Sequence, residues 1–131
     1  MKKDIHIPIV TNVYVAAVKE WNKEFTANEW NAYLINDSKK TLETVLVVTK
    51  GYDDQKKTTL LRHNLGDIPP ESFKKIEYIQ DEVLTMINTF SVTYFYNNQL
   101  FDKRFVFPKN SINERALRDL PVMNVQGVLK K

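Results

Sequence analysis

Cysteine is absent from this chain of 131 residues, and glycine occurs only three times. Without cysteine there is no disulfide, thiol nucleophile, thiolate metal site or iron–sulfur cluster. With three isolated glycines there is no glycine-rich phosphate loop and no dinucleotide fingerprint. Tight turns must then rely on asparagine or aspartate, which tolerate positive φ. A disulfide-dependent secreted domain is therefore excluded.

Long apolar runs are also missing, since the longest is six residues, at 13–18, and others, as at 45–48, are four. We therefore expect no transmembrane helix and no membrane partner. Residues 1–8 have a basic start but no apolar stretch of the kind found in signal peptides. The cytoplasm is the expected location, and a periplasmic mature chain whose signal had been removed would have the same sequence.

The composition is otherwise that of an ordinary soluble domain. Apolar residues make up 43% and charged residues 27% of the chain, which argues against disorder. The length predicts a single domain spanning 1–131. A net charge of +3 is well below that of a dedicated nucleic-acid binder, so nucleic acid is not the expected partner.

Two apolar runs separated by a polar turn are the clearest structural pattern. Trp30–Ile35 and Leu42–Thr49 have the composition of strands, and Asn36–Lys40 lies between them. We interpret this segment as an early hairpin. Trp30, at the start of the first run, is expected in the core.

Further strands are predicted along the chain from alternating apolar residues and turn signals. In Asn12–Lys19 both faces are apolar, which predicts a strand covered on both sides. Asn97-Asn98 is expected to form a hairpin loop. The other predicted strands are an N-terminal edge strand guarded by Pro8 (5–9), a strand ended by a break at Gly66–Pro70 (58–65), the two arms of the Asn97-Asn98 hairpin (90–96 and 99–107) and a last strand with a possible bulge at Gly127 (121–129).

Residues 72–88 fit two patterns. Apolar residues fall at helical spacing from Phe73 to Phe90, which would give a helix at about 72–88 and an α+β fold. The same stretch also reads as two strands with a turn at Gln80–Glu82, and its second half alternates without interruption into the strand ending at Tyr96. We favour the strands.

The resulting fold class is all-β: an antiparallel β-sandwich of about seven to nine strands. Ser111 and Glu114 match a capping box and predict one short helix near 111–119. The strand order across residues 28–108, with a proline-containing lead at Ile68–Pro70, resembles an immunoglobulin-like or fibronectin-like module. The cysteine pair of antibody-type domains is absent. The resemblance implies a scaffold and carries over no catalytic residue.

Catalytic and metal-binding constellations are not found. The histidines are His6 and His63, and His63 shares a strand face with apolar residues, which predicts a structural ring with a satisfied hydrogen bond. No Gly-x-Ser-x-Gly elbow or zinc-ligand spacing is present, and Asp53-Asp54 reads as a turn. We predict no catalytic residue, no cofactor site and no metal site, and hence a protein that is not an enzyme.

Five basic doublets are spread along the chain. They are Lys39-Lys40, Lys56-Lys57, Lys74-Lys75, Lys103-Arg104 and Lys130-Lys131. If successive strands reverse direction, acidic residues fall beside these doublets at both ends of the sandwich. A continuous cationic track is therefore not predicted.

Two places remain as candidate partner contacts. Trp21 and Phe25 lie in a polar connection between Glu20 and Glu29, where they either fold back as a lid or anchor a partner. Ile5 and Ile7 belong to the predicted edge strand, which offers strand addition to a partner or a second copy.

The leading functional hypothesis is a non-enzymatic module for protein interaction or self-assembly, including a homodimer through an edge strand. The alternatives are two. One is a small-ligand pocket between the sheets, with Tyr94, Tyr96, His63 and Arg62 as its polar residues. The other is weak nucleic-acid binding through the lysine doublets with stacking by Tyr52 or Trp21.

Overall fold

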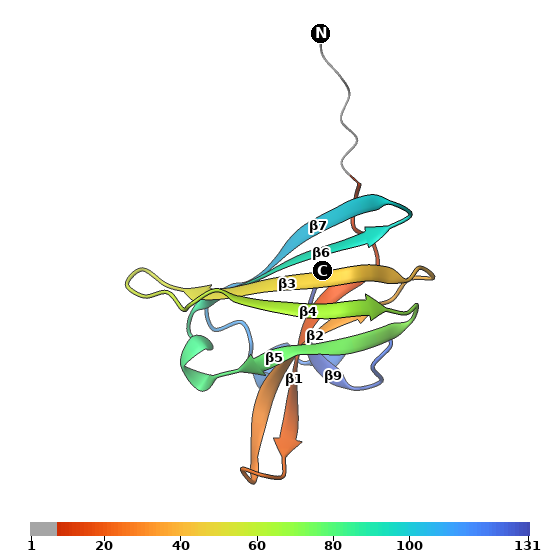
Figure 1. Ribbon diagram of the computed structural model, residues 1–131. Coiled ribbons are helices and arrows are strands. Elements are labelled where there is room, and N and C mark those ends of the chain that lie inside the picture. Colours follow the sequence, from red (N-terminus) through yellow and green to blue (C-terminus); the bar gives the residue numbers. More distant parts are fainter. Residues whose placement is uncertain (1–7) are drawn as a thin grey trace.

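A computed structural model describes residues 8–131 and shows nine strands in two antiparallel sheets (Figure 1). One sheet has the order β5-β2-β1-β9-β8 and the other β4-β3-β6-β7. The predicted all-β sandwich is thus confirmed. The strands are β1 (Val13–Asn22), β2 (Ala27–Asn36), β3 (Leu42–Tyr52), β4 (Leu61–Ile68), β5 (Ser72–Ile79), β6 (Ile87–Tyr96), β7 (Gln99–Phe107), β8 (Arg118–Asp119) and β9 (Gln126–Lys130).

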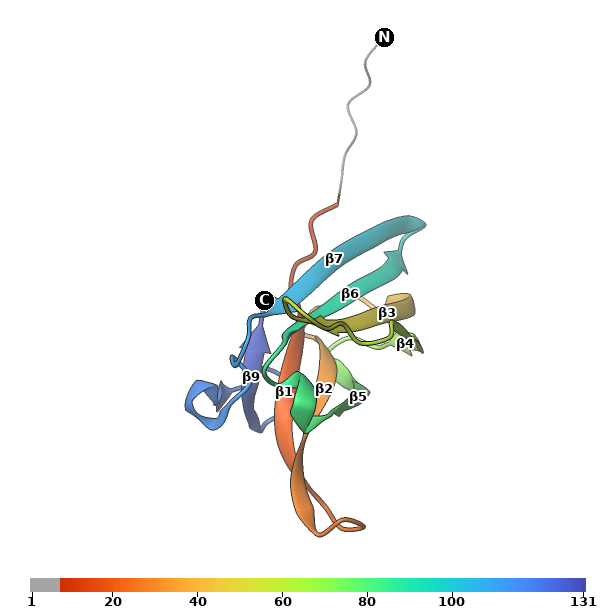
Figure 2. The same ribbon diagram turned by 90° about the vertical axis from the view of Figure 1, so that its left-hand side faces the viewer.

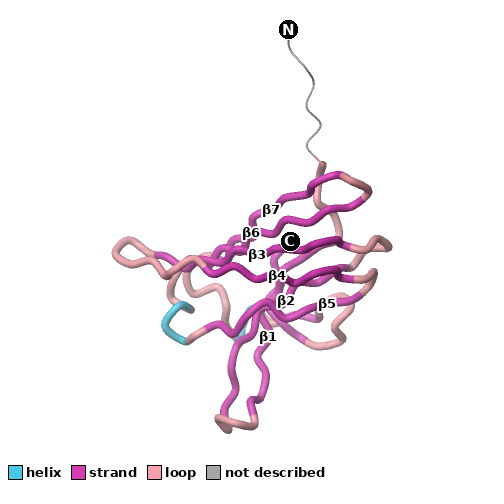
Figure 3. The backbone as a smooth tube through the Cα atoms, viewed as in Figure 1, coloured by secondary structure: helices cyan, strands magenta, loops and turns pink. Residues whose placement is uncertain are grey.

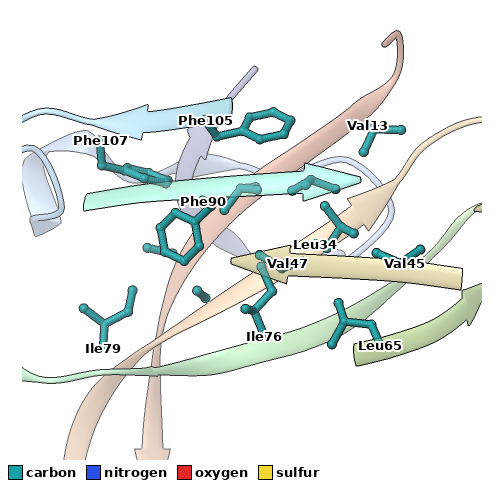
Figure 4. Close-up of a cluster of buried hydrophobic side chains, with 14 of the residues drawn as sticks. Val13, Leu34, Val45, Val47, Leu65, Ile76, Ile79, Phe90, Phe105 and Phe107 are labelled. Atoms are coloured by element: carbon teal, nitrogen blue, oxygen red, sulfur yellow. The ribbon is translucent and has the colours of Figure 1, made fainter. Parts of the chain in front are cut away.

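The core lies between the two sheets. Alternate residues of facing strands point inward, so Leu34 of β2 meets side chains such as Val47 of β3 and Phe90 of β6 (Figure 4). Phe90 and Phe107 pack edge to face, with ring centroids 5.7 Å apart. The strand alternation that predicted the sandwich therefore also builds its core.

The predicted hairpin at Trp30–Thr49 is wrong, because its two strands belong to different sheets. The polar turn is a corner that takes the chain from β2 to β3. Asn36, with a fully buried side chain, fixes this corner: its Nδ2 donates to the carbonyl oxygens of Lys40, Ile68 and Pro69. Its Oδ1 accepts from the backbone and hydroxyl of Ser38. An apolar–turn–apolar pattern fits both a hairpin and a corner between two sheets. Here the long-range hydrogen bonds of Asn36 stabilise the corner.

Strand β1 is covered on both faces, as its sequence predicts. Val15 and Ala17 face the main core, whereas Ala16 and Val18 pack on the opposite side against Leu120. On that side the chain before β9 folds over the sheet. The last strand has no bulge at Gly127 but needs glycine there, because a Cβ would lie 2.8 Å from the carbonyl oxygen of Ala17.

Residues 72–88 form strand β5, the 3₁₀ turn η1 (Asp81–Val83) and the start of β6, so the predicted strands are confirmed and the helix is wrong. Figure 3 shows strands and loops almost throughout, with helical turns only in short pieces. The β6–β7 hairpin turns at Asn97 and Asn98, whose φ angles are 52° and 63°. Asparagine supplies the positive φ that the scarce glycines do not.

Two local expectations need correction. The helix predicted at 111–119 is reduced to the 3₁₀ turn η2 (Glu114–Ala116), capped by the side chain of Asn113 rather than by Ser111. The break expected at Gly66 is part of β4, which continues through this glycine at φ 69°.

The predicted N-terminal edge strand lies largely outside the described residues, which exclude Ile5 and Ile7. Its described part, Pro8 and Ile9, is not a strand. Within residues 8–131 no helix is long and apolar enough to cross a membrane.

Candidate functional site

The β1–β2 hairpin extends beyond the rest of the sandwich (Figures 1 and 2). The two strands pair with each other over their whole length, from Val13↔Asn36 to Asn22↔Ala27. Their outer neighbours are shorter: β9 pairs with β1 only at residues 15–17, and β5 pairs with β2 only from Trp30 onward. Residues 19–29, here called the hairpin tip, are therefore a two-stranded ribbon whose backbone edges pair with no other strand among residues 8–131.

Trp21 and Phe25 lie on this tip and are 58% and 72% exposed. The predicted polar connection at Glu20–Glu29 is thus wrong, because Trp21 is a strand residue and the turn covers only 23–26. Such exposure also rules out the lid that sequence alone allowed. Trp30, by contrast, is buried in the core as predicted. The strand pattern was missed because neither face of the tip is buried.

The base of the tip is fixed by polar contacts. Glu20 Oε1 accepts from Asn31 Nδ2 at 2.8 Å and from the Tyr33 hydroxyl at 2.7 Å. Burial, together with the hydrogen bond to Glu20, raises the pKa of Tyr33 to about 12. Lys19 Nζ lies 2.6 Å from Glu114, which lowers the pKa of that carboxyl. These contacts hold the ribbon in one direction relative to the sandwich.

The turn of the tip is ordered by Asn22. Its Oδ1 accepts from the backbone N–H of Glu24 at 2.9 Å, and its Nδ2 donates to Glu29. Asx-type bonds of this kind favour a defined turn over a flexible loop. Phe25 is therefore presented from a structured turn rather than from a loose one.

A second feature, here called the edge cleft, opens between the sheets with a volume of about 320 Å³. It was not predicted from the sequence. Hydroxyl and amide side chains are frequent in its wall, next to a larger apolar part. The lining residues are Thr49, Lys50, Gly51, Thr58, Thr59, Leu61, Glu77, Tyr78, Gln80, Val83, Asn88, Thr89 and Phe90.

Glu77 is the acidic side chain of this cleft. It lies opposite Ala32 of the core-facing side of β2, and its side chain is only 20% exposed. Its Oε1 accepts from the Thr49 hydroxyl at 2.7 Å and lies 2.7 Å from His63 Nε2. One carboxylate oxygen thus ties β5 to β3 and β4 of the other sheet. The ring of His63 thus has the hydrogen-bond partner that the sequence predicted.

The four residues expected to form a pocket do not converge. His63 lies beside Glu77, and Arg62 is exposed on the neighbouring position of β4. Tyr94 and Tyr96 line a different hollow of about 300 Å³. There Tyr94 stacks on Phe101 with ring centroids 5.1 Å apart, and burial raises its pKa. The edge cleft therefore uses a residue set that the sequence did not indicate.

The basic residues are interleaved with acids, as predicted. Lys39 Nζ lies 3.1 Å from Glu71, and Lys109 Nζ lies 3.7 Å from Asp54. Asp53 forms the predicted turn, in which backbone N–H donors from Gln55 and Lys56 lower its pKa.

Over residues 8–131 no group of three histidine or acidic side chains is placed to hold a metal ion. Comparisons with protein-family models, curated proteins and solved structures give no match for this chain. The hairpin tip and the edge cleft are therefore the features from which function is inferred.

Proposed function

We propose that this protein is a non-catalytic, immunoglobulin-like interaction module that self-associates through its hairpin tip. The observation that carries the proposal is a projecting ribbon with two exposed aromatic side chains and open backbone edges. The partner is a second copy of the chain, added strand to strand along the free edge of β1.

The strand order supports the immunoglobulin-like part of the proposal. If β2, β3, β5, β6 and β7 correspond to strands B, C, E, F and G, then B lies beside E in one sheet and C, F and G share the other. β4 then takes the place of C′ beside C. The chain departs from that pattern in its β8–β9 extension. It also closes the corner before β6 with Asn88, whose Nδ2 donates to the carbonyl oxygen of Val83 at 2.9 Å, rather than with a tyrosine.

A two-stranded ribbon in water is only marginally stable by itself, and exposed strand edges favour pairing with another chain. Aromatic side chains such as Trp21 and Phe25 are common anchors at protein interfaces because they bury a large area at a small cost in side-chain entropy. Two tips placed side by side would form a four-stranded sheet and cover these aromatic rings. The tip thus offers both backbone and side-chain means of association.

The charges of the tip favour a second copy. Lys19, Glu20, Lys23 and Glu24 flank Trp21-Asn22 in an order that is self-complementary. In an antiparallel pair centred between residues 21 and 22, Lys23 of one copy approaches Glu20 of the other. Such a contact has two-fold symmetry, which is the commonest symmetry of homo-oligomers.

The same charges argue against nucleic acid at the tip. Two lysines, at 19 and 23, are outnumbered by three glutamates, at 20, 24 and 29. Phosphate groups would therefore be repelled even though Trp21 is available for stacking. A protein surface is the partner that fits both the aromatic rings and the charge.

Sedimentation equilibrium of the wild-type chain and of the double variant Trp21→Ser/Phe25→Ser tests this proposal. We expect a concentration-dependent dimer for the wild type and a monomer for the double variant. The matched control is Leu60→Ser/Leu100→Ser, which removes two side chains of similar exposure (47% and 50%) that lie away from the tip. This control should dimerise like the wild type.

A wild-type chain that stays monomeric up to about 1 mM would overturn the proposal, because even a contact of about 4 kcal/mol would be half formed there. A dimer that survives the tip substitutions and is lost in the Leu60/Leu100 control would place the interface on the outer face of the other sheet and equally contradict it. Circular dichroism of all three proteins establishes that they fold alike.

A further inference from the structure

We propose that the edge cleft binds a small organic cation, a primary ammonium group on a short apolar stem, with Glu77 as its counter-ion. This inference does not depend on the hairpin tip, because the cleft lies between the sheets at β3, β5 and β6. Binding in the cleft can therefore be tested independently of self-association.

The hydrogen bonds of Glu77 leave half of the carboxylate available. Thr49 and His63 both use Oε1. Among the described residues no hydrogen-bond partner is present for Oε2, although the side chain is only 20% exposed. A structural tie between the sheets needs one acceptor oxygen, which a glutamine would also provide. The negative charge of Glu77 and its second carboxylate oxygen are therefore available to bind another group.

Charge in the cleft favours a cation. Of the described lining residues, Glu77 alone is acidic, and the Lys50 ammonium lies over the ring of Tyr52, 5.0 Å from its centroid. Lys50 and Tyr52 are on the outward face of β3, away from the core-facing Thr49. The second oxygen of this largely buried carboxylate would accept a charge-assisted hydrogen bond from an ammonium ligand.

The remaining lining fits an ammonium group on an apolar stem. An ammonium offers three donors and no acceptor, so it needs several oxygen atoms around it. Besides Glu77, the wall includes Thr59 and Gln80, whose side chains contain a hydroxyl and a carbonyl oxygen. Val83, Leu61 and Phe90 supply an apolar part. At about 320 Å³ the space is near the lower end of ligand pockets, which suits a compact molecule.

The test is a titration of ¹⁵N-labelled protein with three probes of equal length: n-butylamine, n-butanol and butyrate at neutral pH. Butylamine is then protonated, as a lysine side chain is. We expect it to shift the backbone amides of Gly51, Thr59 and Gln80 saturably, with a dissociation constant on the order of 1 mM for so small a ligand. The neutral alcohol and the anion should shift them much less.

Glu77→Gln keeps an acceptor oxygen for Thr49 and removes the charge, so we expect it to weaken butylamine binding at least about tenfold. The matched control is Glu71→Gln, which changes an exposed acid paired with Lys39. It should bind butylamine like the wild type.

Equal shifts with butanol and butylamine, no saturable shift with butylamine, or unchanged binding by a folded Glu77→Gln would each overturn the proposal. Saturable shifts at the same amides with methyl glucoside but not with butylamine would assign the cleft to polyhydroxyl ligands and overturn it as well. If Glu77→Gln does not fold, the three-probe comparison on the wild type decides the question alone.

Discussion

Both halves of the β1–β2 hairpin carry apolar side chains, but these side chains meet very different surroundings. In the half inside the sandwich, Val15, Ala16 and Leu34 are fully buried. In the tip of the same hairpin, Trp21 and Phe25 are more than half exposed. The difference comes from the neighbours: β9 and β5 flank the first half and stop before the second.

The inner half of the hairpin thus contributes to stability, whereas the tip is suited to recognition. Side chains of the inner half are covered by folding, so they contribute to the free energy of unfolding. Those of the tip gain little from folding and are available for a contact between copies. Substitutions in the two halves should therefore affect different measurements.

The largest expected effect is in the inner half. Leu34→Ala leaves a cavity in a fully packed core and should lower the free energy of unfolding by about 3–4 kcal/mol. Trp21→Ala removes a larger side chain from the same hairpin, yet should change the free energy of unfolding by no more than about 0.5 kcal/mol. Urea unfolding of both variants measures the difference. Similar losses for the two would show that the tip is packed as part of the fold.

Next in size is the corner that ends the inner half. Asn36→Ala removes the donor for the carbonyl oxygens of Lys40, Ile68 and Pro69 in a buried site, so we expect a loss of about 2–3 kcal/mol. Asn28→Ala, in the exposed tip, is the matched control and should be nearly neutral. A neutral Asn36→Ala, measured by the same unfolding experiment, would mean that the corner holds without this side chain.

Gly127→Ala tests whether the close approach of β9 to β1 stabilises the inner half of the hairpin. The added Cβ would meet Leu120 Cδ1 at 2.7 Å and the Ala17 carbonyl oxygen at 2.8 Å, so a loss of about 2 kcal/mol is expected. Gln126→Ala changes the exposed neighbour and should have little effect. Amide hydrogen exchange at residues 15–17 should accelerate in the glycine variant only.

The smallest expected effect concerns Tyr33, whose hydroxyl connects the inner half to Glu20 of the tip. Because folding raises its pKa from 10.0 to about 12, its contribution to stability is complete below pH 10. That contribution is lost as the pH rises toward 12. The difference in unfolding free energy between wild type and Tyr33→Phe should shrink across this window. A constant difference would mean that this hydroxyl is not the titrating group.

Much of the fold was predictable because buried strands alternate. Residues 72–88 were assigned to strands by an alternation that continued to Tyr96, and Asn97-Asn98 marked the hairpin through the conformational tolerance of asparagine. The Trp30–Thr49 segment shows the limit. Its local pattern suits a hairpin and a corner equally, and the choice depends on Asn36 bonds to residues more than thirty positions away.

The candidate sites were harder to predict for related reasons. The tip lacks alternation because neither of its faces is buried, so its strands read as a polar loop around Trp21 and Phe25. The edge cleft depends on Glu77 meeting His63 and Thr49 from other strands. Residues that lie far apart in the sequence form no spacing pattern from which a site could be predicted. The exposed tip aromatics were nevertheless found, because a tryptophan in a polar stretch is unusual.

Distances between copies show whether two tips meet in an antiparallel pair. The chain has no native cysteine, so Lys23→Cys and Gln99→Cys each accept one spin label, the first at the tip and the second on the exposed β6–β7 end. Pulsed electron spin resonance should give a short, narrow distance between copies for position 23 and a longer one for position 99. A short distance at position 99, or no distance between copies at position 23, would contradict self-association through the hairpin tip.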